Sequence, residues 1–86
     1  MNKDVQPYYQ LFARAVKQQN IDLLEYACTT TLDFLKRSHI KDSPSKKYLE
    51  RELKEINETL SAQVSNTLSK NTLSQLKRVS NLFKRL

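Results

Sequence analysis

Apolar side chains recur every three or four residues along nearly the whole chain, which is the spacing of one helix face. The first stripe of this kind is formed by Tyr8, Leu11, Phe12, Ala15 and Val16. Pro7 suits the first turn of a helix, and Asp4 or Gln6 is then its expected cap. The amide residues 18–20 are expected to end this first helix.

A second stripe predicts a helix over residues 21–37. Its main positions are Ile21, Leu24, Cys28, Leu32 and Leu35. Asn20 is placed to cap this helix, and its connection to the first helix is short, so the two helices should be antiparallel neighbours. The three threonines at positions 29–31 lose χ1 freedom in a helix, and packing must compensate for them.

Residues 38–43 have the clearest loop composition, and Ser43 followed by Pro44 is typical of a helix start. The predicted third helix is the longest and runs from Pro44 to about Leu68. Its apolar stripe consists of Leu49, Leu53, Ile56, Leu60, Val64 and Leu68. Polar residues of low helix propensity fill its last turns, so a bend or fraying is expected there.

A fourth helix is expected to begin at Asn71 or Thr72, because Thr72 and Gln75 have the spacing of a capping box. Its stripe consists of Leu73, Leu76, Val79, Leu82, Phe83 and Leu86. Four amphipathic helices with short connections predict an all-α fold, an antiparallel up-down-up-down four-helix bundle that forms a single domain over residues 1–86. A three-helix packing with the first helix docked loosely is the structural alternative. The absence of Gly disfavours hairpin-rich β folds and phosphate-cradling loops.

Positive charge is concentrated in the last third of the chain. The net charge is +6, yet residues 1–58 hold ten Lys or Arg and nine Asp or Glu, whereas residues 59–86 hold five basic residues and no acid. Such asymmetry indicates an acidic partner: a membrane surface, a nucleic acid or an acidic protein. The alternative is a solvated basic face that keeps a small protein in solution. The candidate partner-binding residues are Lys70, Lys77, Arg78, Lys84 and Arg85.

The residue pattern gives no indication of catalysis or of a cofactor. Cys28 lies on an apolar stripe and is expected in the core, and His39 lies in a loop without an acidic neighbour. One Cys and one His cannot form a metal-ligand cluster of the usual kind. The glutamates of the third helix are spaced for i, i+4 ion pairs on an exposed face. We therefore expect no enzyme, no metal and no cofactor.

The chain has no apolar run long enough for a membrane span, and its first residues lack the apolar core of a secretory signal. A cytoplasmic location is expected. Residues 73–86 are amphipathic and basic, which also suits peripheral association at the inner membrane face. Nucleic acid is the less favoured partner, although a basic last helix suits phosphates. The connection before that helix lacks the usual Gly, and Tyr8, Phe12, Phe34 and Phe83 fall on apolar stripes instead of forming a platform for bases.

One combination of features spans residues 44–86. It consists of an initial proline, a long-helix stripe, a polar stretch and a last amphipathic helix, carried by Pro44, Leu49, Leu53, Ile56, Asn66, Leu68, Ser69, Leu73, Leu76, Val79 and Leu82. This combination resembles the immunity proteins of class IIa (pediocin-like) bacteriocins, the enterocin A immunity family. The resemblance implies a small, basic, cytoplasmic protein of four antiparallel helices with a long third helix, and a function other than catalysis.

Members of that family protect the producing cell from its own pore-forming peptide. The resemblance implies action from the cytosolic side on a membrane-embedded sugar-transporter receptor with bound bacteriocin, and it associates specificity with the C-terminal half. The resulting hypothesis is immunity by binding, in which the basic side of the last helix meets the receptor–bacteriocin complex and holds the pore closed. The alternative is a small basic DNA-binding or regulator-binding helical protein.

Overall fold

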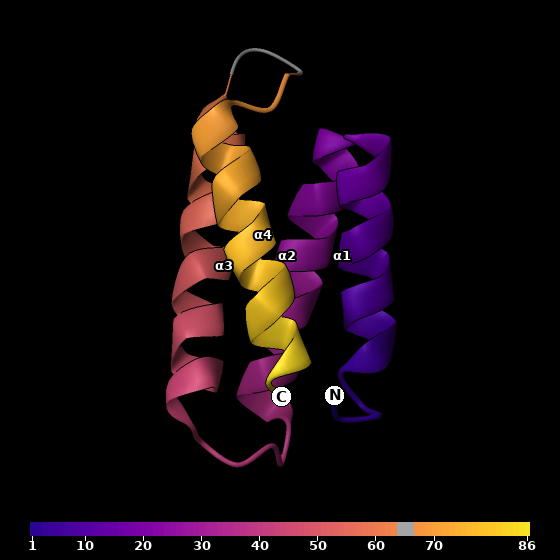
Figure 1. Ribbon diagram of the computed structural model, residues 1–86, viewed down its shortest axis with the longest axis vertical. Helices are drawn as coiled ribbons and strands as arrows, with labels where there is room; N and C mark the ends of the chain where they lie inside the picture. The colour runs from indigo at the N-terminus through magenta and orange to yellow at the C-terminus, as the bar shows by residue number, and fades with distance from the viewer. Residues whose placement is uncertain (64–66) are drawn as a thin grey trace.

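The computed structural model describes residues 1–63 and 67–86 of the chain. Within them, four helices follow one another: α1 (Gln6–Gln18), α2 (Ile21–Arg37), α3 (Pro44–Ala62) and α4 (Lys70–Lys84). They run alternately up and down the long axis of the molecule, so both chain ends lie at the same end of the bundle (Figure 1). The prediction of an all-α, antiparallel four-helix bundle is confirmed.

The apolar stripes of all four helices meet in one core. Each helix packs against its neighbour in sequence, and α1 and α4 close the ring. The first helix is an integral part of this core: Phe12 and Ala15 are buried, and the ring of Tyr8 stacks on Phe34 of α2 with centroids 4.3 Å apart. Phe12 also approaches Phe83 of α4, at a centroid distance of 5.4 Å. The alternative of three helices with a loosely docked first one is therefore wrong.

The connections that the sequence predicts most sharply are confirmed. Asn20 caps α2, because its side chain accepts a hydrogen bond from Leu23 N at 3.0 Å. Ser43 caps α3 in the same way, accepting from Lys46 N at 3.1 Å, with Pro44 in the first helical turn. Between α1 and α2 the backbone turns at Gln19, which adopts a left-handed conformation with φ of 50°.

The start of α1 differs from the prediction of a cap at Asp4 or Gln6. Val5 occupies the capping position and makes no side-chain hydrogen bond there. Its side chain is buried in the core, and its carbonyl accepts hydrogen bonds from the amides of Tyr8 and Tyr9, each at 3.0 Å. Burial of an apolar side chain thus fixes the first turn where a polar cap was expected.

The third helix ends at Ala62, short of the predicted Leu68. Ser and Thr become frequent in this part of the chain and have low helix propensity. Gln63 is already extended, and its side-chain amide donates to Thr67 O at 2.7 Å. Leu68 is buried, as its position on the stripe requires, but it lies in the connection to α4. Val64 and Asn66, which also figured in the sequence pattern, lie outside the described residues.

The fourth helix starts at Lys70, one or two residues before the predicted Asn71 or Thr72, because Ser69 is its cap. Ser69 Oγ accepts from Thr72 N at 3.2 Å and lies 2.9 Å from Thr72 Oγ1. The expected capping box with Gln75 does not form. The Gln75 amide instead donates to two α3 carboxylates, those of Glu52 at 2.6 Å and Glu55 at 3.2 Å.

One polar group in the core lacks a partner. Thr31, on the buried side of α2, is 1% exposed, and its hydroxyl makes no hydrogen bond within the part of the chain that the structure describes. A buried hydroxyl without a partner costs about 1–3 kcal/mol of stability. Packing therefore buries Thr31, but it leaves the hydrogen-bonding capacity of its hydroxyl unused.

We expect Thr31→Val to raise the free energy of unfolding by about 1 kcal/mol, because a methyl group replaces the unpaired hydroxyl at nearly the same volume. Urea unfolding followed by circular dichroism measures the change. Thr30→Val, at a half-buried position next to it, is the matched control and should change the free energy of unfolding by less than half as much. An unchanged or lower stability of Thr31→Val would show that the hydroxyl is satisfied in solution.

Candidate partner-binding surface

The four basic residues of α4 and Arg85, its C-cap, are all exposed, but they do not form one face. At 100° per residue, positions seven apart lie nearly above one another on a helix. The lysines therefore make one row along α4 and the two arginines make another, with Lys70, Lys77 and Lys84 in the first and Arg78 and Arg85 in the second. The rows border different neighbours, since Lys77 lines a hollow shared with α1, whereas Arg78 and Arg85 line one shared with α3.

The arginine row lies beside α3 and makes a contact there. Arg78 Nε is 3.6 Å from Glu52 Oε1, and the Glu52 carboxylate also accepts the hydrogen bond from Gln75. A hollow of about 350 Å³ opens next to this contact between the two helices. It is lined by Tyr48, Glu52, Arg78, Asn81, Leu82 and Arg85.

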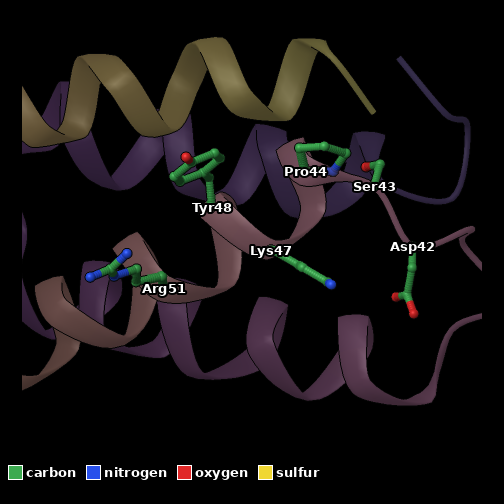
Figure 2. Close-up of a pocket in the computed structure, with 6 residues that line it drawn as sticks. All are labelled: Asp42, Ser43, Pro44, Lys47, Tyr48 and Arg51. Atoms are coloured by element: carbon green, nitrogen blue, oxygen red, sulfur yellow. The ribbon is translucent and has the colours of Figure 1, made fainter.

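A second hollow, of about 480 Å³, lies at the start of α3 and shares Tyr48 with the first. It is lined by Asp42, Ser43, Pro44, Lys47, Tyr48 and Arg51. Figure 2 shows the Tyr48 ring directed toward α4, while the Lys47 and Arg51 side chains extend in other directions from the same helix. The Tyr48 ring therefore separates two adjoining hollows that both carry basic side chains.

The loop below this second hollow is held by Lys46, which is buried at the start of α3. Its ammonium donates to the Ile40 carbonyl at 3.3 Å and to Asp42 Oδ1 at 3.1 Å, where it forms an ion pair. A buried ammonium needs such partners to offset its desolvation. The contact also neutralises Asp42, so the acid nearest to the hollow is already paired.

We call Lys47, Tyr48, Arg51, Arg78 and Arg85 together the Tyr48 surface. The ring of Tyr48 is 57% exposed. The acid Asp42 has its partner in Lys46, and two of the basic groups are paired with α3 carboxylates, Arg78 with Glu52 and Arg51 with Glu55 at 3.8 Å. The excess of positive charge around the ring therefore comes from Lys47 and Arg85, which make no ion pair within the described residues. An exposed Tyr among arginines is the composition typical of the energetic centre of protein interfaces. Chemically, the surface suits an acidic segment of a protein.

Three members of this surface were not predicted from the sequence: Lys47, Tyr48 and Arg51. The four aromatic residues assigned to apolar stripes, Tyr8, Phe12, Phe34 and Phe83, do lie in or against the core. Tyr48 and Tyr26 were not among them, and they are 57% and 60% exposed. A signal existed for Tyr48: it precedes Leu49 of the α3 stripe, lies about 100° away from it around the helix, and adjoins a lysine.

The candidate residues of the lysine row are spread along the molecule. Lys70 is the first residue of α4 and Lys84 its last, so about 21 Å of helix separates them. Lys77, midway between them, lines a hollow with α1 residues. The structure thus brings Arg78 and Arg85 to the Tyr48 surface, and it places Lys70, Lys77 and Lys84 on the other edge of α4.

The Cys, His and acidic side chains that could serve catalysis or metal binding do not form a cluster in the described part of the chain. No group of three or more His, Cys, Asp and Glu side chains suited to a metal ion occurs among residues 1–63 and 67–86. Cys28 is fully buried in the core, as its stripe predicts. Burial raises the pKa of its thiol from an ordinary 9.0 to about 12, and the negative charge of Glu25 adds to this shift. A thiol of this kind is protonated and inert at neutral pH.

We expect the Cys28 thiol to resist modification in the native protein, because roughly one thiol in ten thousand is ionised at pH 8 when the pKa is about 12. Reaction with a chromogenic disulfide reagent, compared with and without urea, measures this protection. The double variant Cys28→Ala/Thr29→Cys moves the thiol to an exposed neighbouring position and should react at the rate of a free thiol. Equal rates for the native and unfolded protein would contradict the buried position of Cys28.

Comparison with known proteins identifies no relative: no family model, no curated protein and no solved structure matches the chain. Across the described residues, none of the helices has the length and apolar character that crossing a bilayer requires.

Proposed function

We propose that this chain is a bacteriocin immunity protein, which protects its host cell by binding and without catalysis. The partner in this proposal is a membrane-embedded sugar-transporter receptor with bound bacteriocin, met from the cytoplasmic side. The sequence pattern of residues 44–86, with its long third helix and its basic last helix, supports this choice. The antiparallel four-helix fold is the fold that the resemblance implies.

The observation that carries the proposal is the basic surface centred on Tyr48. The large apolar side chains of the four stripes are mostly consumed in the core, whereas this ring stays in solvent among four basic side chains. Exposed aromatic and guanidinium groups contribute little to folding, and they are the groups that contribute most to protein recognition. The Tyr48 surface is therefore our choice for the side of the protein that meets the receptor complex.

Expression inside a bacterium that is sensitive to pediocin-like bacteriocins should confer resistance to one or a few members of a panel. The minimal inhibitory concentration of each bacteriocin, with and without the protein, measures the protection. Sensitivity to every member of a broad panel, with the protein shown to be present and folded, would contradict the proposed function.

Within a protected strain, Arg78→Gln/Arg85→Gln should reduce protection at least about tenfold, because the Tyr48 surface loses two of its four basic side chains while Gln can still hydrogen-bond to Glu52. Tyr48→Ala should have a similar effect. The matched control is Lys36→Gln/Lys54→Gln, which removes the same charge from exposed positions on α2 and α3. Full protection by the arginine variant, or equal loss in the control, would show that the Tyr48 surface is not the binding site.

The DNA-binding alternative is tested with the purified protein in a binding assay. Phosphate contacts by the lysine and arginine rows would give an affinity for a DNA fragment that falls steeply as salt rises. Such an affinity, together with an absence of protection, would favour that alternative over the immunity proposal.

A further inference from the structure

A different hollow, of about 570 Å³, lies between α1 and α4. Its walls include the half-buried side chains of Val16 and Leu73, and two lysines, Lys17 from α1 and Lys77 from α4, border it. No acidic residue is among those that line it. We call this hollow the α1–α4 groove.

The groove exists because α1 and α4 are held together at one end and carry small side chains further along. Phe83 contacts Phe12 and Tyr9, with ring centroids 5.4 and 5.6 Å apart, near the end of α4. Figure 1 shows α4 beginning beside α3 and ending nearer to α1. Where the two helices part, Ala13 of α1 and Ser80 of α4 line the space between them, and neither side chain is large enough to fill it.

The lining has the arrangement that receives an amphipathic helix. Side chains of two helices provide an apolar floor, and a basic group on each wall lies where the flanks of a docked helix would come. A hollow of this size takes several apolar side chains, whereas a single acyl chain is usually bound in a more enclosed pocket that covers most of its surface. The lysines and the absence of lining acids favour an occupant with acidic residues on its flanks.

We propose that the α1–α4 groove docks an amphipathic helix of a partner protein, with an apolar stripe of i, i+3, i+4 and i+7 spacing and acidic residues beside it. The inference rests on the proposed function, since it describes one element of the partner that the protein would meet. The groove adjoins the hollow between α3 and α4 on the Tyr48 side, because Asn81 lines both. A partner that lies across α4 therefore contacts both.

A direct binding experiment tests the groove without bacteriocin or receptor. The probe is a fluorescein-labelled helical peptide about four turns long, with leucines at the spacing given above and glutamates on both sides. Fluorescence anisotropy should show saturable binding that weakens as salt rises. Amide signals of Ala13, Val16, Leu73 and Ser80 in the NMR spectrum of the protein should shift during the titration. A peptide of the same composition in scrambled order should produce neither effect.

Filling the groove should prevent docking. Ser80→Phe is expected to lower the affinity for the peptide at least about tenfold, because the new ring occupies the space of the incoming side chains. Ser61→Phe, at an exposed position of α3, is the matched control and should bind the peptide as the native chain does. Ala13→Leu serves as a second filling variant, and circular dichroism establishes that each variant is folded.

Reversal of charge tests the acidic flanks of the occupant. Lys17→Glu/Lys77→Glu should lower the affinity at least about tenfold and reduce its salt dependence, whereas Lys36→Glu/Lys54→Glu, with the same change of net charge, should leave both nearly unchanged. No saturable binding, or binding that survives both filling variants, overturns the inference. Shifts of the groove signals caused by phosphatidylglycerol vesicles and not by the peptide also overturn it, in favour of a lipid.

The outcomes separate this inference from the proposed function. Peptide binding that Ser80→Phe abolishes, in a protein that protects against no bacteriocin, supports the groove and contradicts immunity. Protection by a protein that shows no peptide binding supports immunity and contradicts the groove. If both hold, Ser80→Phe should also lose protection, while Ser61→Phe should retain it.

Discussion

Phe83 holds the last helix against the first, and the closed form of the bundle depends on this contact. Its ring lies in the core, in contact with Tyr9 and Phe12 of α1. The other pairs of packed helices are neighbours in sequence and are joined by short connections. The pair α1 and α4 has no such connection, so the aromatic contact must keep these two helices together, as a short loop does for the other pairs. Where that contact ends, small residues follow and the α1–α4 groove opens.

This arrangement determines how charged side chains are distributed on the outer side of α4. Helix α4 packs along α3 but meets α1 mainly near Phe83, so its two edges have different surroundings. The arginine row lies along the edge next to α3, where the acids already have partners, and the lysine row lies along the edge next to α1. Asn81 lies between these edges and lines a hollow on each side. The charge of the last helix therefore divides between a surface rich in guanidinium with an exposed Tyr and a groove bordered by ammonium groups.

Sequence periodicity predicted all four helices and the composition of most of the core, because each stripe has only one side of a helix to occupy. The bounds of α2 agree with the prediction since Asn20 and the loop at 38–43 are unambiguous signals. The start of α4 was harder to place, since Ser69, Asn71 and Thr72 are all good caps and the choice depends on Leu68 being buried in the connection. Gln75 was assigned to a local capping box, but α3 carboxylates provide it with better partners.

The candidate surface was predictable only in part. The division of the α4 cations into two rows follows from seven-residue spacing alone. The meeting of Arg78 and Arg85 with Tyr48 depends on how α3 and α4 are rotated against each other, and residues about thirty positions apart give no periodic signal of that rotation. The groove could not be predicted either. A small residue such as Ala13 or Ser80 leaves space only if the residue facing it is also small, and the sequence does not show which residues face each other.

The order in which the helices pack has a consequence for how the chain reaches its native state. Contacts between sequence neighbours close short loops at a small entropic cost, and a topology rich in them has a low contact order and folds fast. The packing of α1 on α2, of α2 on α3 and of α3 on α4 is of this kind. Joining Phe83 to α1 brings together the two ends of the chain and carries the largest loop-closure entropy among the described contacts between helices. The entropic cost of docking α4 on α1 is therefore lowest when α2 and α3 have already packed, because the assembled helices hold the two ends of the chain close together.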